Sequence, residues 1–180
     1  MGNEIEIRVA ELRQLFDPID PSPFGERDLD PRAVAFIIAW ARDLRRDAPL
    51  ALRVHLDRPS GRSDDEALLR EAVHQFFAAR AEASRRSLRE LFRRGRISLV
   101  IALGFLAVAT AVSDLLRSYG GGFTELLRQG LIIGGWVAMW RPLEVFLYDW
   151  WPIVGEIRLL DRLAAMPVRI DPGHTVGESA

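Results

Sequence analysis

An uninterrupted apolar segment constrains this chain more than any other feature of its sequence. Residues 97–113 contain no charged side chain, and the apolar stretch continues to Leu116 with only four polar residues in it. Twenty helical residues rise by about 30 Å, which is the thickness of a bilayer's hydrocarbon core. The alternative, a core helix of a soluble protein, would need more surrounding chain than 180 residues supply. Residues 97–116 are therefore predicted to cross a membrane.

A second apolar stretch, from Leu126 to about Val154, predicts a hairpin of two transmembrane helices. Unlike the first stretch, it contains four charged residues, which are Arg128, Arg141, Glu144 and Asp149. A charge at the centre of a bilayer costs about 2.5–3.5 kcal/mol on insertion scales. The hairpin is therefore predicted over residues 97–141, with the membrane exit at Trp140–Arg141.

Two placements of the second span stay open. In the favoured one, Pro142 begins an interfacial amphipathic helix within a C-terminal segment 142–180, and the aromatic residues of that helix lie at headgroup depth. Those aromatic residues are Tyr148, Trp150 and Trp151. The other placement spans residues 131–151 and holds Arg141 and Glu144 inside the membrane as an i,i+3 pair.

The distribution of arginine predicts the orientation of the hairpin. Between Arg80 and Arg96 there are seven arginines against two acidic residues, whereas the connecting segment 113–130 holds two of each. Arginine also follows the second span, at positions 158, 162 and 169. Cytoplasmic flanks carry an excess of basic residues, so both termini are expected in the cytoplasm of a bacterial cell, with the hairpin in the inner membrane. The first ten residues do not read as a signal peptide, because Glu4, Glu6 and Arg8 interrupt them.

Residues 1–96 are predicted to form a small cytosolic α/β domain that ends in a basic stalk helix. Polar and apolar residues alternate over 4–9 and over 50–56, which is typical of strands with one buried face. Between them, Asp30 before Pro31 predicts a helix that runs to about Arg46.

A second helix is expected after the second strand. Ser63 and Glu66 have the spacing of a capping box, and the helix that they start can continue to Arg96. The order is therefore β-α-β-α, and the fold class is α+β with a membrane hairpin. Because a two-stranded sheet is marginal alone, a third strand is expected in Leu12–Phe16, or from another copy, or from a partner protein.

The residue types that are missing exclude much chemistry. The chain has no cysteine, and all 24 of its Lys and Arg residues are Arg, which excludes thiolate, zinc–thiolate and Schiff-base sites. His55, His74 and His174 are too scattered to bind a metal, and His55 is expected on the solvent face of its strand. Turn chemistry and helix capping explain the aspartates of the proline-rich loop, at positions 17, 20, 28 and 30, better than a calcium loop does. No catalytic, cofactor or metal site is predicted, and a net charge of −1 gives no support for nucleic-acid binding.

Three groups of residues are candidate sites. The first is a basic cluster for contact with lipid headgroups, formed by Arg85, Arg86, Arg89, Arg93, Arg94 and Arg96. The second is a helix-packing ridge of small residues, formed by Gly130, Gly134 and Ala138, which fits either packing within the hairpin or homo-oligomerisation. The third is a polar cluster at the membrane, formed by Arg141, Glu144 and Asp149.

Two motifs carry a resemblance to known sequences. They are Asp20-Pro21-Ser22-Pro23-Phe24-Gly25-Glu26-Arg27-Asp28-Leu29-Asp30 and Trp140-Arg141-Pro142-Leu143-Glu144-Val145-Phe146-Leu147-Tyr148-Asp149-Trp150-Trp151-Pro152. Together they resemble a group of uncharacterised two-transmembrane-helix bacterial membrane proteins, over most of residues 1–170. The resemblance implies a two-span membrane protein and no particular activity.

The sequence favours a non-enzymatic function. The leading hypothesis is a membrane-anchored interaction or regulatory module, with membrane lipids, a second copy of the chain and a cytosolic protein as partners. The alternative is a subunit of a small oligomeric channel or transporter that uses Arg141 and Glu144. A membrane enzyme ranks third, because no nucleophile and base stand at a recognisable spacing.

Overall fold

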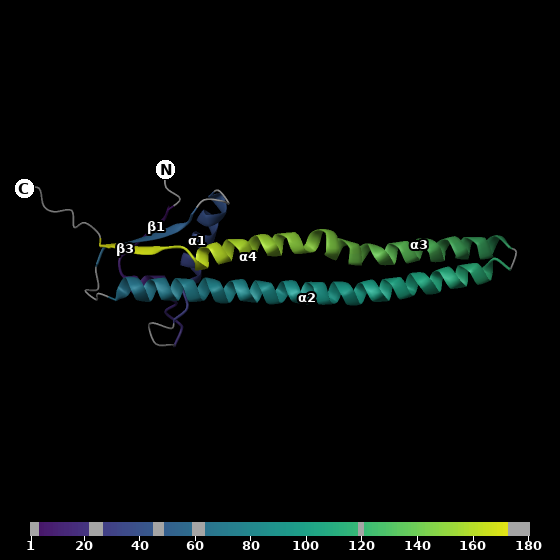
Figure 1. The fold of residues 1–180 in the computed structure, drawn as a ribbon, viewed down its shortest axis with the longest axis horizontal. Coiled ribbons are helices and arrows are strands. Elements are labelled where there is room, and N and C mark those ends of the chain that lie inside the picture. The colour runs from purple at the N-terminus through teal and green to yellow at the C-terminus, as the bar shows by residue number, and fades with distance from the viewer. Residues whose placement is uncertain (1–3, 22–26, 45–48, 59–63, 119–120, 173–180) are drawn as a thin grey trace, which may run out of the picture. The chain divides into compact units, whose positions relative to one another are not determined.

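The computed structural model describes residues 4–21, 27–44, 49–58, 64–118 and 121–172 of the chain (Figure 1). It is mostly helical, with a small sheet of three parallel strands and two long apolar helices. The strands are β1 (Glu4–Val9), β2 (Ala51–Leu56) and β3 (Val168–Pro172). The helices are α1 (Pro31–Asp43), α2 (Asp65–Leu116), α3 (Gly122–Glu144) and α4 (Trp150–Ala164), with a 3-10 turn η1 (Leu12–Leu15) and a π-helical turn η2 (Val145–Asp149).

The chain divides into two compact units, and each is described by itself. The α/β unit consists of Met1–Ala83 together with Glu156–Ala180. The hairpin unit is the segment Ser84–Gly155. The α/β unit is therefore built from both ends of the chain, and the hairpin unit is an insertion between them.

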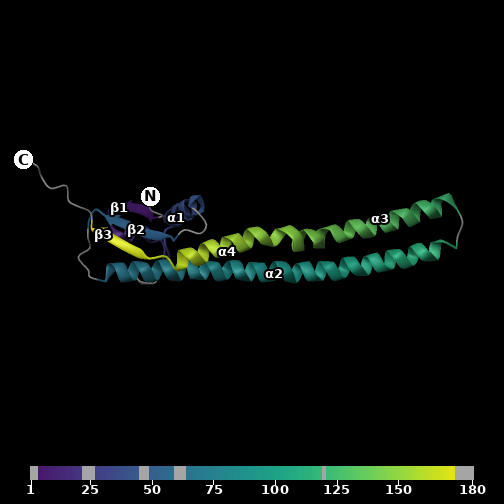
Figure 2. The same cartoon turned by 45° about the horizontal axis from the view of Figure 1, so that its top comes forward.

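The sheet of the α/β unit has the order β1-β2-β3, and Figure 2 shows the three strands side by side. All pairs are parallel, and Leu52 of the central strand lies between Ile5 of β1 and Val168 of β3. Strand β1 is the one predicted over residues 4–9, and β2 differs from the prediction by one residue at its start.

The origin of the third strand differs from the prediction. Residues 12–15 form a 3-10 turn rather than a strand, and the missing strand is Val168–Pro172 of the same chain, in the segment predicted as a C-terminal tail. Its apolar residues, Val168 and Ile170, alternate over only five positions. So short a pattern gives little sequence signal, and the strand forms because the sheet edge of β2 is available to it.

One hydrophobic core holds the α/β unit together. Residues from the sheet, α1, the first turns of α2 and the end of α4 are buried in a single cluster. Its largest fully buried side chains include Phe16, Phe77, Leu69 and Leu163. In β2, Leu52, Val54 and Leu56 are buried, whereas the alternate residues are half-buried, so the core covers one face of the sheet.

Local capping explains where α1 begins. Asp30 Oδ1 accepts hydrogen bonds from the backbone N–H groups of Arg32, at 2.7 Å, and Ala33, at 3.3 Å, with Pro31 in the first turn. This confirms the predicted start, while the helix ends at Asp43, short of the predicted Arg46, which lies outside the described residues. Ser63 of the predicted capping box also lies outside them, and α2 begins at Asp65.

In the hairpin unit, the chain does not break where a new helix was predicted. Pro142 lies inside α3, near its end, instead of starting an interfacial helix. Proline lacks the N–H group that the α-helical ladder needs, and the backbone changes to a π-helical turn at Val145–Asp149 before α4. The change in the helix therefore follows the proline by one turn.

We expect Val168→Asp to unfold the α/β unit, because Val168 is 2% exposed and would place a carboxylate in the core. The expected loss is about 3 kcal/mol or more, measured as a fall in thermal stability and faster proteolysis of residues 1–83. Arg169→Asp is the matched control, since its side chain is exposed on the other face of the same strand. Equal effects of the two substitutions would contradict the burial of β3.

Candidate functional site

The two helices of the hairpin unit pack through glycine. A Cβ built on Gly95 would lie 2.7 Å from Val145 Cγ1, and one built on Gly135 would lie 2.6 Å from Leu106 Cδ1. Neither glycine has room for a side chain, so α2 lies close to η2 at Gly95 and close to α3 at Gly135. On α2, small buried residues continue the contact at a heptad spacing, with Ala102 and Ala109 following Gly95.

These contacts fix which residues of the two helices lie level with one another. Position 95 lies beside 145, and position 106 lies beside 135. Ile97, where the uncharged segment of α2 begins, is therefore level with about Leu143, next to Arg141 and Glu144. The basic segment of α2 and the polar cluster of α3 thus flank the same end of the uncharged segment.

Most apolar side chains of the hairpin unit point outward. In each of the two candidate spans, only 17% of the most apolar window is buried, whereas a core helix of a soluble protein is mostly buried. Exposed large apolar residues cover α2 from Ile97 to Leu115 and α3 from Phe123 to Leu143. They form a continuous exposed apolar surface, hereafter the apolar belt, far larger than scattered exposed leucines on a soluble protein.

The structure brings the predicted polar cluster together. Arg141 Nη1 lies 3.0 Å from Glu144 Oε2 and 3.8 Å from Asp149 Oδ2. Trp140 Nε1 donates a hydrogen bond of 3.0 Å to the other oxygen of Glu144. All three charged groups stay partly exposed, with side-chain exposures of 70%, 41% and 35% for Arg141, Glu144 and Asp149. The arginine side chain therefore extends toward later residues, away from the middle of α3.

The opposite end of α3 carries a matching pair. Arg128 donates hydrogen bonds to Glu125, three residues earlier, and Gln129 Nε2 donates one of 3.0 Å to the same carboxylate. Near the end of α2, Arg117 Nε lies 3.5 Å from Asp114 Oδ1. Each arginine of α3 thus pairs with a glutamate three residues farther from the uncharged stretch 129–140.

The predicted basic cluster lies on α2, just before the apolar belt. Glu90 joins two of its members: its carboxylate accepts hydrogen bonds from Arg93 Nε, at 3.0 Å, and Arg94 Nε, at 2.9 Å. The hydrogen bonds from Arg93, and next those from Arg94, lower the pKa of Glu90 below its usual value of 4.5. Glu90 therefore stays ionised at neutral pH and neutralises only part of the cluster.

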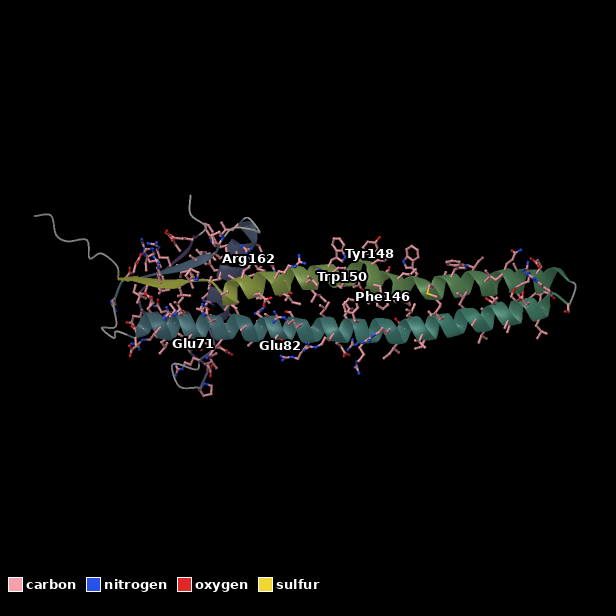
Figure 3. The ribbon with its side chains drawn as sticks, in the orientation of Figure 1. Glu71, Glu82, Phe146, Tyr148, Trp150 and Arg162 are labelled. Atoms are coloured by element: carbon pink, nitrogen blue, oxygen red, sulfur yellow. The ribbon has the colours of Figure 1, made fainter. Side chains whose placement is uncertain are left out.

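A groove beside this cluster combines charge with aromatic surface, and it is hereafter called the Arg–Phe groove. Its volume is about 560 Å³, and its lining residues are Arg89, Phe92, Arg93, Arg96 and Phe146. The rings of Phe92 and Phe146 have centroids 6.0 Å apart at 31°. Figure 3 shows Phe146 pointing toward α2, whereas Tyr148 points away from it.

The π-helical turn η2 supplies Phe146 to this groove. Such a turn leaves backbone carbonyl groups without their regular partners, and Trp150 Nε1 donates a hydrogen bond of 2.9 Å to the carbonyl oxygen of Phe146. The sequence motif gave no sign of this function for Trp150, because a tryptophan near a membrane exit is expected at headgroup depth in any case.

Gly130 and Gly134 of the predicted ridge are not the points of close contact in the hairpin. Nothing lies within 4 Å of a Cβ built on Gly130, and one built on Gly134 reaches only Phe105, at 4.0 Å. The contact uses Gly135 instead, a residue that the four-residue spacing of Gly130, Gly134 and Ala138 passes over. On α2, the heptad spacing of Gly95 and Ala102 would have indicated the packed face, but it does not indicate which glycine of α3 lies against it.

Ion pairs cross the polar face of the sheet in the α/β unit. Arg53 Nη2 lies 3.1 Å from Glu4 Oε1, and Arg53 Nη1 lies 3.0 Å from Asp171 Oδ2, so one side chain connects all three strands. His55 lies on the same face, 3.9 Å from Glu6, as predicted for the solvent side of its strand. Hydrogen bonds to both carboxylates, with Glu4 the larger cause, raise the pKa of Arg53.

The aspartates of the proline-rich loop serve the backbone, as predicted. Asp17 Oδ1 accepts a hydrogen bond of 2.9 Å from the N–H of Ile19, and Asp20 Oδ2 accepts one of 2.8 Å from the N–H of Asp28. No group of three metal-ligating side chains occurs within the described ranges.

We expect Gly135→Leu to destabilise the hairpin unit, because the new side chain would meet Leu106 and force the helices apart. Gly134→Leu is the matched control: it adds the same side chain one residue away, where there is room. Thermal unfolding in detergent should show a loss of about 1–3 kcal/mol for the first variant only. A similar loss in both would contradict the assignment of the contact to Gly135.

Comparison with known proteins gives no family for the chain. No family model, no curated protein and no solved structure matches it. The resemblance of the two motifs to a bacterial membrane-protein group therefore stays a prediction, and the functional argument rests on the geometry described above.

Proposed function

We propose that this protein is an integral protein of the bacterial inner membrane that carries a cytosolic interaction or regulatory module. The observation that carries the proposal is the apolar belt of the hairpin unit, exposed along both helices and bounded at each end of α3 by an ion pair. Water around such a surface would be unfavourable, whereas lipid chains match it. The belt is also about as long as the 30 Å hydrocarbon core of a bilayer.

The directions of the two arginines support this placement. Arg128 pairs toward the beginning of α3, and Arg141 pairs toward its end. Arginine near the end of a span extends its charge to the interface while its methylene groups stay in the apolar region. Both side chains follow this rule if the hydrocarbon core is centred on the uncharged residues 129–140 and ends near the paired glutamates, Glu125 and Glu144, which a helical rise of about 28 Å separates. The polar cluster of Arg141, Glu144 and Asp149 is then an interfacial ion network.

The sheet supports a topology with both termini on one side. Strand β2 precedes the two spans and β3 follows them, yet the two strands pair directly. Strands on opposite sides of a membrane cannot share hydrogen bonds, so the chain must return. The arginine excess before the first span assigns that side to the cytoplasm.

The surface of the α/β unit supports a binding function. On α1, Phe36 and Trp40 are 42% and 48% exposed, with ring centroids 6.0 Å apart. Exposed aromatic pairs are common anchors of protein–protein interfaces. We therefore propose a cytosolic protein partner for this unit.

The channel hypothesis has less support. An ion-conducting pore would need Arg141 and Glu144 to line a cavity between helices. Instead, Arg141 is exposed and its side chain pairs with Glu144 and Asp149. A second copy of the chain remains part of the proposal, because Gly130 of the predicted ridge is exposed and nothing lies within 4 Å of a Cβ built on it.

The topology can be tested with reporter fusions. A reporter after Ala180 should be active in the cytoplasm, and one inserted at Gly121, between α2 and α3, should be active in the periplasm. Fusion after Asp43, in the α/β unit ahead of both spans, is the control and should report the cytoplasm. A periplasmic signal from the C-terminal fusion would contradict the two-span hairpin.

The substitution Glu144→Gln distinguishes the hypothesis of an interfacial ion network from that of a channel. Because the pair is partly exposed, we expect the substitution to reduce stability by about 0–1 kcal/mol and to leave ion flux through liposomes unchanged. Thermal unfolding and liposome flux of the wild type and the variant give the answer. Flux in the wild type that disappears in the variant would favour the channel.

A further inference from the structure

We propose that the Arg–Phe groove binds one anionic phospholipid, with the phosphate on its arginines and the first part of an acyl chain on Phe92 and Phe146. The inference deepens the proposed function and rests on it, because it places the groove at the cytoplasmic boundary of the hydrocarbon core. It goes beyond a general attraction between a basic segment and a membrane, since it assigns particular residues to the lipid.

The spacing of the arginines fits one headgroup. Arg89, Arg93 and Arg96 stand at i, i+4 and i+7 on α2, so they share one face of the helix over a rise of about 10 Å. Guanidinium groups bind phosphate oxygens through two parallel hydrogen bonds, which gives arginine an advantage over a point charge. Arg85, Arg86 and Arg94 belong to the same basic cluster but do not line the groove.

The apolar part of the groove distinguishes a lipid from a free anion. Phe92 and Phe146 contribute aromatic surface directly beside the arginines, and the lining is more apolar than polar. Inorganic phosphate has no apolar part that could contact this surface, whereas a phospholipid carries acyl chains close to its phosphate. The groove also adjoins Ile97, where the apolar belt begins, so a chain that leaves the headgroup continues along exposed apolar residues.

Glu90 limits the charge that the lipid meets. It already holds Arg93 and Arg94, and its lowered pKa keeps it ionised at neutral pH. An incoming phosphate therefore competes with Glu90 for Arg93. Removing this carboxylate should strengthen lipid binding, which is the opposite of what the loss of an arginine should do.

The test uses the full-length protein, purified in detergent and titrated with phosphatidylglycerol or phosphatidylcholine of identical chains, with bound lipid counted by native mass spectrometry. The wild type should bind more phosphatidylglycerol than phosphatidylcholine. Arg96→Gln should weaken that binding about fivefold, as expected for one arginine near an anionic lipid. Glu90→Gln should strengthen it. Phe146→Ala, which changes no charge, should weaken it for both lipids.

Arg86→Gln is the matched control, because it removes the same charge from the basic cluster but outside the groove and without changing the ion pairs of Glu90. Equal losses in Arg86→Gln and Arg96→Gln would overturn the proposal in favour of diffuse attraction. Displacement of phosphatidylglycerol by millimolar inorganic phosphate would overturn it in favour of a soluble anion. Helical circular dichroism of each variant verifies folding, and Phe92→Leu repeats the aromatic test if Phe146→Ala does not fold.

Flotation distinguishes this proposal from the proposed function. Protein reconstituted into phosphatidylcholine vesicles should float with them and resist extraction by carbonate. Flotation without any preference for phosphatidylglycerol would overturn the lipid site and leave the membrane hairpin intact. Failure to associate with the vesicles would overturn the membrane hairpin itself.

Discussion

The pairing of β2 with β3 is the constraint on which the rest of the structure depends. It joins Leu52 to Val168, residues separated by the entire hairpin, and it buries both in one core. Without it the sheet has two strands, which rarely suffice for a stable domain. With it, the hairpin unit becomes an insertion whose two ends must return to the same sheet. The pairing of these two strands thus stabilises the α/β unit, and it is also the reason why the proposed topology has an even number of membrane crossings.

The hairpin follows a different physical rule. In the proposed membrane location, lipid chains are as apolar as leucine side chains, so burial of apolar surface would contribute little to the association of the two helices. Close approach at Gly95 and Gly135 supplies the packing contacts instead, while the large side chains stay on the outside. The two units therefore use opposite patterns: the α/β unit buries large apolar side chains, and the packed face of the hairpin unit is formed mainly by small residues, among them Gly95, Ala102, Ala109 and Gly135.

The sequence predicted those elements whose signal is local. Three such signals are read from consecutive residues, and the structure contains all three elements: the alternating strand at 4–9, the helix cap at Asp30 and the long apolar segment of α2. Strand β3 was missed because its alternation covers only five residues and its partner lies more than 100 residues away. The glycine contact was missed for a related reason: the spacing of Gly130 and Gly134 is equally regular, and only the partner helix decides which glycine faces it.

The candidate site shows where local charge arguments reach their limit. The sequence indicated which residues are basic, but six arginines on one helix point in several directions, and their chemistry depends on neighbours. Glu90 draws Arg93 and Arg94 into ion pairs, while Phe146 arrives from a π-helical turn that no residue pattern predicted. The turn lies between α3 and α4, three residues after Pro142. It places an aromatic ring beside three arginines, and this juxtaposition converts a basic stretch into a groove with both charged and apolar surface.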